Sequence, residues 1–102
     1  MPIRVRPAVH PGEILREEYM LPLKLSGYAL GKALGVPRTR IERLAAKKTA
    51  VTPDTAIRLG RYFSTSPDFW INLQAAYDLT MAEDQVDAAA INAIRPRHSA
   101  AA

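Results

Sequence analysis

Apolar residues recur at helical spacing along most of the chain, and short groups of polar residues and prolines separate these stretches. Leu30 and Leu34 lie four residues apart, and Ile41 and Leu44 lie three apart, which places each pair on one face of an α-helix. No alternating β-branched run and no Asn-Gly hairpin turn is present. The pattern therefore predicts an all-α fold, a compact bundle of about five to six helices.

Capping residues and prolines predict where the first two helices begin and end. His10-Pro11 opens the first helix, since a proline suits the first helical turn. That helix is expected to close at Pro22, because the residue before a proline avoids the α region. Ser26 is a favoured N-cap for the second helix. The second helix is expected to end at Gly35, because glycine readily adopts the left-handed conformation of a C′ residue.

Four more helical segments are predicted after Gly35. Val36-Pro37 begins the third, and a cap, a proline and an acid begin the fourth and fifth, at Thr52-Pro53-Asp54 and Ser66-Pro67-Asp68. A capping-box sequence, Thr80-Met81-Ala82-Glu83, predicts a sixth segment that reaches Ile94. The buried side of the fourth helix is expected to consist of Ile57, Leu59, Tyr62 and Phe63.

Residues 26–46 have the pattern of a helix-turn-helix, with two aliphatic residues on the second helix pointing inward. Gly31 lies where two steeply crossed helices must approach closely. A glycine inside a helix costs about 1 kcal/mol relative to alanine, which favours a packing reason for it. Gly35 supplies the positive φ of the turn. Units of this kind place their second helix in the major groove of DNA.

Positive charge is concentrated on the second helix of this motif. Between residues 38 and 48 there are five basic residues and one acid, a net charge of +4, so the rest of the chain balances at 9 basic and 9 acidic residues. Base reading is predicted for Arg38, Thr39 and Arg40, in the N-terminal half of the helix. Phosphate contacts that carry no sequence preference are predicted for Arg43, Lys47 and Lys48. The N-cap Ser26 completes the predicted DNA-binding set. The alternative is that the charged residues of the second helix form only a solvated face.

The length of 102 residues fits one domain that needs no metal or disulfide to hold its core. Prolines at positions 2 and 7 indicate an extended arm at residues 1–9. The DNA-binding domain is expected at 10–79, a C-terminal helical segment at 80–94 and a disordered tail at 95–102.

Several kinds of chemistry are excluded by the residues present. The chain has no cysteine, and its histidines, His10 and His98, are far apart, so we expect no metal and no cofactor. Glu17 and Glu18 are adjacent and point about 100° apart on a helix, which rules out a paired-carboxylate site. We expect no enzyme activity and no small-molecule substrate. The chain lacks a secretory or membrane-spanning apolar run, so no membrane association is predicted and a cytoplasmic location is expected.

The chain resembles the HigA-family antitoxins, a branch of the Xre-type, phage-repressor-like helix-turn-helix proteins. Three stretches carry the resemblance: HPGEILREEY at 10–19, ALGKALGVPRTRI at 29–41, and TPDTAIRLGRYFSTSPDFWINLQAAYDL at 52–79. It implies an autorepressor that binds its own double-stranded operator DNA and neutralises a HigB/RelE-like, mRNA-cleaving toxin. Two departures from the family pattern are Gly27, often a glutamine, and Ala46-Lys47, commonly Asn-Gly. A stand-alone phage-type regulator and a protein-interaction module without DNA binding are the alternatives.

Two further surfaces are predicted. A homodimer is expected, because one such domain reads only a few base pairs and dimers pair two half-sites. The dimer interface is assigned to Phe69, Trp70, Leu73, Tyr77 and Val86, the alternative for the aromatic residues being ordinary core. A basic toxin favours an acidic surface, which we assign to the arm and first helix, at Val5, Val9, Glu13, Glu17 and Glu18. A second acidic group consists of Glu83, Asp84 and Asp87.

Overall fold

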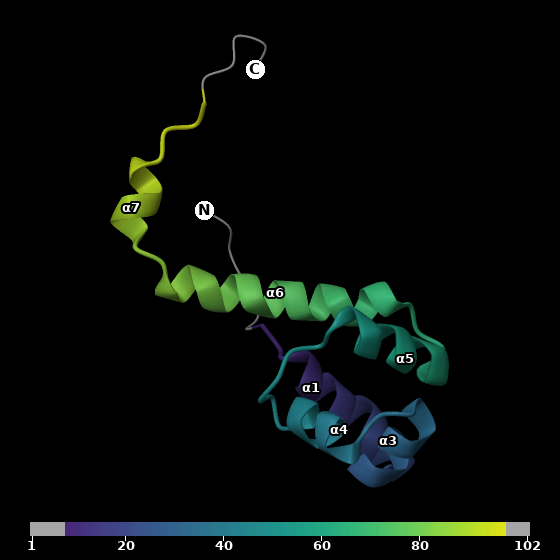
Figure 1. The fold of residues 1–102 in the computed structure, drawn as a ribbon. Helices are drawn as coiled ribbons and strands as arrows, with labels where there is room; N and C mark the ends of the chain where they lie inside the picture. Colours follow the sequence, from purple (N-terminus) through teal and green to yellow (C-terminus); the bar gives the residue numbers. More distant parts are fainter. Residues whose placement is uncertain (1–7, 98–102) are drawn as a thin grey trace.

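The computed structural model describes residues 8–97, and within this range it contains helices and connecting turns but no β-strand. The predicted all-α fold is confirmed (Figure 1). One continuous helical stretch comes first, made of α1 (Pro11–Ile14), η1 (Leu15–Met20) and α2 (Leu21–Leu23). The later helices are α3 (Gly27–Leu34), α4 (Arg38–Ala45), α5 (Pro53–Phe63), α6 (Pro67–Gln85) and α7 (Ala88–Ala93).

The prediction that the first helix closes at Pro22 is wrong. Leu21 has helical φ and ψ of −64° and −49°, and the helix continues through Leu23. Just before the proline, the Leu21 N–H donates to the carbonyl of Arg16, five residues earlier, which is π-helical spacing. In a regular α-helix the proline ring clashes with the carbonyl four residues back, and the wider π-turn moves that carbonyl away. Lys24, at φ 55°, then ends the stretch.

The predicted caps at Ser26, Gly35, Thr52 and Ser66 are confirmed. Ser26 Oγ accepts a hydrogen bond from the Ala29 N–H at 3.0 Å, and Gly35 ends α3 with φ 74°. Thr52 Oγ1 caps α5 and Ser66 Oγ caps α6, each by accepting from a backbone N–H of the first turn. These boundaries follow the sequence because each one depends on residues within a single turn.

The predicted helix start at Thr80 is wrong, because α6 runs unbroken from Pro67 to Gln85. Thr80 through Glu83 include good helix formers, and a capping-box sequence can also lie inside a helix that has already started. The helix stops at Val86, which is extended with ψ 155°. Asp87 caps the next helix, since its carboxylate accepts from the N–H groups of Ala89 and Ala90.

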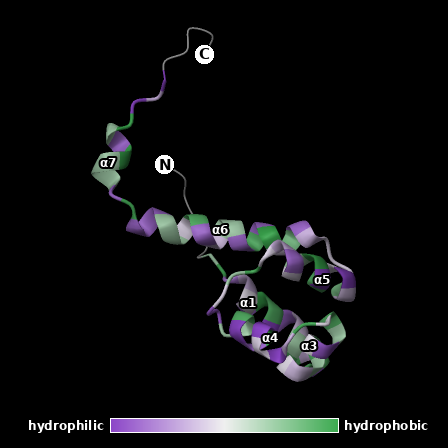
Figure 2. Cartoon of the chain, viewed as in Figure 1, coloured by the Kyte–Doolittle hydropathy of each residue, from purple (hydrophilic) through white to green (hydrophobic). Residues whose placement is uncertain are grey.

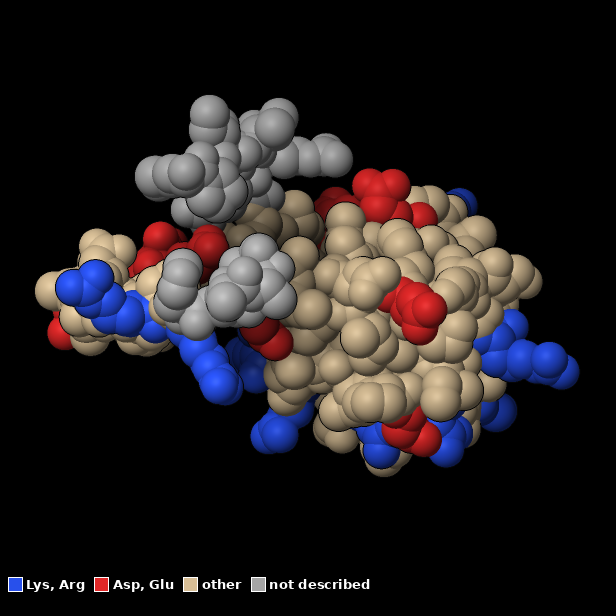
Figure 3. Space-filling view, turned by 90° about the horizontal axis from the view of Figure 1, so that it is seen from above, with Lys and Arg blue, Asp and Glu red and all other residues tan. Residues whose placement is uncertain are grey.

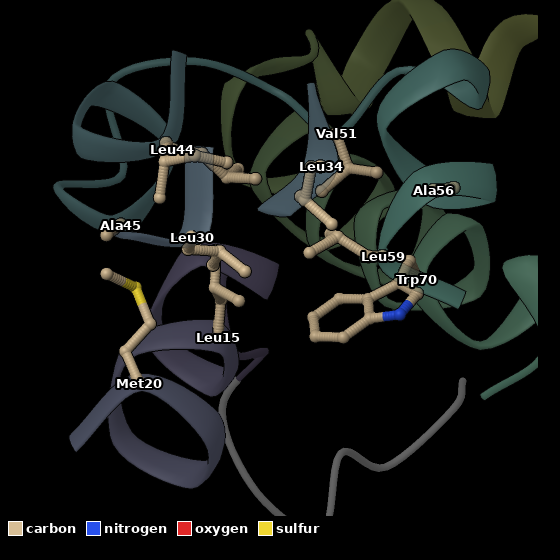
Figure 4. Packing of buried hydrophobic residues seen from close by; sticks show 11 residues of the cluster. Leu15, Met20, Leu30, Leu34, Leu44, Ala45, Val51, Ala56, Leu59 and Trp70 are labelled. Carbon is tan, nitrogen blue, oxygen red and sulfur yellow. The ribbon is translucent and has the colours of Figure 1, made fainter. Parts of the chain in front are cut away.

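The core lies where the first helical stretch meets α3, α4, α5 and α6 (Figure 4). Leu30 and Leu44 are almost fully buried, and Leu30 lies beside Leu15 of the first helical stretch. Trp70 closes the core from α6 and donates from Nε1 to Thr65 Oγ1 at 2.9 Å. Burying one side chain of this size contributes roughly 1.5–3 kcal/mol. The fully buried large side chains are those of Trp70, Leu15, Leu30, Ile41, Leu44, Leu59 and Pro11.

The buried side of α5 differs from the prediction. Leu59 is buried as expected and Phe63 is half-buried, but Ile57 and Tyr62 are 59% and 45% exposed. Small residues take the inward positions instead. A Cβ on one of them, Gly60, would lie 2.6 Å from the Thr65 carbonyl oxygen. The helix therefore packs closely through small residues together with Leu59, whereas Ile57 and Tyr62 face outward.

The C-terminal part of the chain stands away from the core. Residues 81–97 are all exposed, including the apolar side chains of Val86, Ile91 and Ile94. In Figure 1, α7 projects beyond the end of α6, and the principal extents of the protein are 55 × 27 × 24 Å. Most of the predicted arm at 1–9 and of the predicted tail at 95–102, namely residues 1–7 and 98–102, lies outside the described residues. Within the described range, every helix is too short or too polar to cross a membrane.

Candidate nucleic-acid interface

The α3–α4 crossing has the close approach that the sequence predicted. A Cβ built on Gly31 would lie 2.9 Å from the carbonyl oxygen of Val36 and 3.1 Å from the Cα of Arg38. Both neighbours are backbone atoms, so a larger residue would push the two helices apart. The Val36 N–H donates back to the Gly31 carbonyl at 2.9 Å, which closes the turn around Gly35. The two helices are thus held in a fixed crossing.

Helix α4 presents its charged side chains to solvent. Ile41 and Leu44 are buried at 0% and 1% exposure, and this orientation turns Arg38, Thr39 and Arg40 outward. Arg43 is also exposed, one turn further along. Figure 2 shows predominantly hydrophilic residues along α4. The structure thus brings the predicted base-reading residues together on one exposed helix.

A hollow of about 480 Å³ lies between α4 and the start of α5. Its walls include Thr39, Arg40 and Arg43 on one side; the other side is formed by Thr49, Ala50, Thr52, Asp54 and Thr55. A second hollow beside it is lined by Thr39, Glu42, Arg43, Ala46 and Lys48. This concave, basic surface is of the kind that nucleic-acid-binding proteins present to phosphates.

Asp54, at the start of α5, contacts the exposed arginine in the middle of this surface. Its Oδ2 lies 2.7 Å from Arg40 Nη1 and 3.0 Å from Arg58 Nε. Hydrogen bonds from Arg40 and then from Arg58 hold the pKa of the Asp54 carboxyl below its usual value. The sequence pattern identified Asp54 only as an acid in the first turn of a helix. Its contact with Arg40 spans 14 positions and depends on how α4 and α5 pack.

The end of α4 separates the two lysines that were predicted to contact phosphate. Lys47 adopts φ 65°, the left-handed conformation that glycine favours, so the helix ends there although no glycine is present. Lys47 Nζ lies 3.5 Å from Glu13 Oε1 on α1, whereas Lys48 lines the hollow beside Thr39 and Arg43. Arg16 supports this end of α4 by donating to the Ala45 carbonyl at 3.0 Å.

Ser26 and Gly27 lie at the N-terminal end of α3. Ser26 is exposed, and its hydroxyl is used as the cap described above. A Cβ on Gly27 would lie 2.6 Å from Cγ of Glu42, a flexible side chain of α4. The two ends of the helix-turn-helix therefore meet at Gly27 and Glu42, and Glu42 Oε2 also lies 4.0 Å from Arg38 Nε.

The residues predicted for the dimer interface lie in different environments. Trp70 is fully buried in the protomer, so its assignment to a dimer interface is wrong and the alternative of ordinary core holds for it. Leu73 and Tyr77 are half-buried, and the Tyr77 ring packs against His10 with 4.9 Å between ring centroids. Phe69 and Val86 are 38% and 47% exposed and remain available to a partner.

The residues predicted for toxin binding also differ in accessibility. Val5 lies outside the described residues, and Val9 is half-buried. Glu13 is half-buried beside Lys47, as described above. Glu17 and Glu18 are exposed, and Glu17 pairs with Arg16 at 3.0 Å.

The face over α6 carries scattered Asp and Glu residues, with Lys and Arg at its margins (Figure 3).

His10 caps the first helix, as its position before Pro11 predicted. Its Nδ1 accepts from the Gly12 N–H at 2.9 Å, and the side chain is buried. Burial, followed by repulsion from Lys47, lowers the pKa of His10 below the usual 6.5. Gly12 itself fits tightly, because a Cβ there would fall onto the Leu44 carbonyl oxygen. In residues 8–97 no group of three or more acids or histidines is arranged to hold a metal.

Comparison with known proteins agrees with this geometry. The HTH_3 helix-turn-helix family matches residues 16–70. Virulence-associated protein I of Dichelobacter nodosus is 52% identical over 88% of this chain and 82% of its own length. Antitoxin HigA-1 of Vibrio cholerae is 35% identical over 72% of this chain and 70% of its own length.

A solved structure, the Pseudomonas aeruginosa antitoxin HigA with the higBA promoter, has a TM-score of 0.83 to this one. The two are 38% identical, and the match covers 89% of this chain and 99% of that chain. Sequence and structure thus agree over both the helix-turn-helix and the helices that flank it. The chain belongs to the HTH_3 helix-turn-helix family, in the branch of the HigA-family antitoxins.

Proposed function

We propose that this protein is a DNA-binding antitoxin that represses its own operon. The observation that carries the proposal is the row of exposed Arg38, Thr39 and Arg40 on α4, which Gly31 holds in a fixed crossing with α3. Support comes from the similar P. aeruginosa HigA, whose structure was determined with the higBA promoter. Helix α4 enters the major groove, and its N-terminal half faces the base edges.

Different residues supply sequence preference and general affinity. Arg38, Thr39 and Arg40 read bases, since arginine pairs bidentately with guanine and the threonine methyl contacts thymine. Arg43 and Lys48, which line the adjacent hollow, bind phosphates. The N-terminal end of α3, at Ser26, contributes a further phosphate contact. Lys47 reaches a phosphate only by giving up its contact with Glu13, so its contribution to affinity is the smallest of the set.

The test is selection of duplexes from a random-sequence library by the purified protein. An operator-binding protein enriches one sequence, and its affinity for that sequence falls steeply with salt as counterions are released. A folded Arg38→Ala/Arg40→Ala variant is expected to enrich no sequence. Enrichment of the same sequence by this variant would reject the assignment of α4, and no enrichment by the wild type would favour a protein-interaction module.

The operator-binding form is a homodimer in this proposal. The exposed apolar residues of the C-terminal region, Val86, Ile91 and Ile94, lie on a part of the chain that stands away from the protomer core. Phe69 adds exposed aromatic surface at the other end of α6. A chain ending at Gln85, compared with the full chain by light scattering, is expected to shift toward monomer. An unchanged mass would exclude α7 from the interface.

The second partner is a basic, RelE-like, mRNA-cleaving toxin of the HigB class, bound on the arm and first helical stretch. Exposed Glu17 and Glu18 supply charge complementarity there, on residues separate from those of α4. Co-purification with the product of the neighbouring gene tests this, using Glu17→Lys/Glu18→Lys in a chain that lacks residues 1–9. Capture by this variant but not by Arg38→Ala/Arg40→Ala would place the toxin on the DNA-binding face. DNA binding without any toxin capture would favour a stand-alone regulator.

A further inference from the structure

Asp54 and Arg58 together join three helices around the candidate DNA-binding surface. Asp54 Oδ2, on α5, accepts from Arg40 Nη1 on α4 at 2.7 Å and from Arg58 Nε on α5 at 3.0 Å. Arg58 also donates from Nη1 to the carbonyl of Leu34, the last residue of α3, at 2.7 Å. Both helices of the helix-turn-helix are therefore tied to α5 through Asp54 and Arg58.

A carboxylate at this place opposes simple attraction to DNA. Asp54 lines the same hollow as Arg40 and Arg43, and a negative charge there repels the phosphate backbone. Hydrogen bonds from its two arginines keep Asp54 ionised. Together with Arg40 and Arg58 it forms a group of net charge +1, where the two arginines alone would carry +2. The arrangement thus reduces attraction to DNA of any sequence.

We propose that Asp54 is a positioning residue for base recognition, which holds the Arg40 guanidinium in one orientation and keeps it from neighbouring phosphates. The inference rests on the proposed operator binding by α4. The guanidinium is a planar fork with five N–H donors. With Nη1 fixed to Asp54, other donors remain for a guanine edge, and side-chain freedom is lost before DNA arrives rather than on binding. Asp54 thereby favours the operator over other sequences.

The test is Asp54→Asn, which keeps the side-chain shape and removes the charge. Two duplexes serve as probes: the sequence that the wild type enriches from a random library, and a scrambled duplex of the same composition. The ratio of operator to scrambled affinity is expected to fall about tenfold, within the range of one bidentate base contact. Affinity for scrambled DNA is expected to rise, and its salt slope to steepen by about one phosphate contact. A purely structural role for Asp54 would lower both affinities together.

A matched control is Asp68→Asn. Asp68 is the first-turn acid of α6, as Asp54 is of α5, so the substitution makes the same charge change at the same helical position. It is expected to leave the affinity ratio unchanged. A second control is Asp54→Asn in an Arg40→Ala background, where the ratio should fall no further if Asp54 acts through Arg40.

Two results would overturn the inference. One is that folded Asp54→Asn keeps the wild-type ratio of operator to scrambled affinity. The other is that Asp54→Asn lowers this ratio equally in the wild-type and the Arg40→Ala backgrounds. A wild-type protein that shows no preference for any duplex is a different result, because it rejects the proposed operator binding itself. The selection experiment therefore separates failure of the function from failure of the role assigned to Asp54.

Discussion

The side-chain oxygen of Gln74, buried on α6, accepts a hydrogen bond from the backbone N–H of Val51 at 2.8 Å. Val51 is itself buried and lies in the connection between α4 and α5. Gln74 Nε2 donates in turn to Asp78 Oδ1 at 2.8 Å, which fixes the orientation of the amide. The segment that follows α4 is thereby anchored to α6.

Replacing Gln74 with leucine is expected to lower the free energy of unfolding by about 1–3 kcal/mol, because the Val51 N–H is left buried without an acceptor. Urea denaturation measures this change. Leu73→Ala on the same helix is a comparison that removes apolar contact and leaves the hydrogen bond in place. Wild-type stability in Gln74→Leu would show that water replaces the amide and that the anchor contributes little.

Two glycines of α3 provide a matched pair of substitutions. Gly31→Ala is expected to destabilise the protein, because the new methyl group meets the backbone of Val36 and Arg38. Gly27→Ala meets only the flexible side chain of Glu42, and alanine gains roughly 1 kcal/mol of helix propensity. Thermal melting should therefore rank Gly27→Ala at or above the wild type and Gly31→Ala below it. The reverse order would contradict the close crossing of α3 and α4.

His10 predicts a pH dependence of stability. Its pKa in the folded protein lies below 6.5, because burial and nearby Lys47 disfavour the imidazolium. Well above pH 6.5 the histidine is neutral in both the folded and the unfolded state and has no effect on stability. Below it the unfolded chain takes up the proton first, so the free energy of unfolding falls until the pH passes the lowered pKa. Urea denaturation from about pH 8 down to about pH 5 measures this loss.

The control for the pH effect is His10→Asn, since the asparagine oxygen can accept the Gly12 N–H bond without titrating. The variant should lose less stability than the wild type over the same acid range. Equal losses would assign the effect to carboxylates elsewhere in the protein.

Structural features that depend on local sequence were predicted more accurately than features that depend on packing between helices. The caps at Ser26, Thr52 and Ser66 and the turn at Gly35 each depend on neighbouring residues, and all were predicted. The π-turn before Pro22 was missed, because it depends on how the first helix relieves the proline clash. The start at Thr80 was wrong for a related reason, since a capping box does not show whether a helix has already begun.

In the candidate site, too, the features set by local sequence were predictable and those set by packing between helices were not. The outward row of Arg38, Thr39 and Arg40 follows from the inward positions of Ile41 and Leu44 by helical period alone. The hydrogen bond from Arg40 to Asp54 could not be predicted, because it depends on the packing of α4 beside α5. The burial of Trp70 also needed the three-dimensional structure, since an aromatic residue at that position suits either a core or an interface.

Base reading by α4 is tested by comparing Arg40→Ala with Lys48→Ala on the selected operator and on a scrambled duplex. Arg40→Ala should lose about 1–3 kcal/mol of binding to the operator and most of the preference over scrambled DNA. Lys48→Ala should weaken both duplexes equally and reduce the salt slope by about one. If folded Arg40→Ala keeps the wild-type preference for the operator, α4 does not read the operator through this residue and the proposed mode of DNA recognition is wrong.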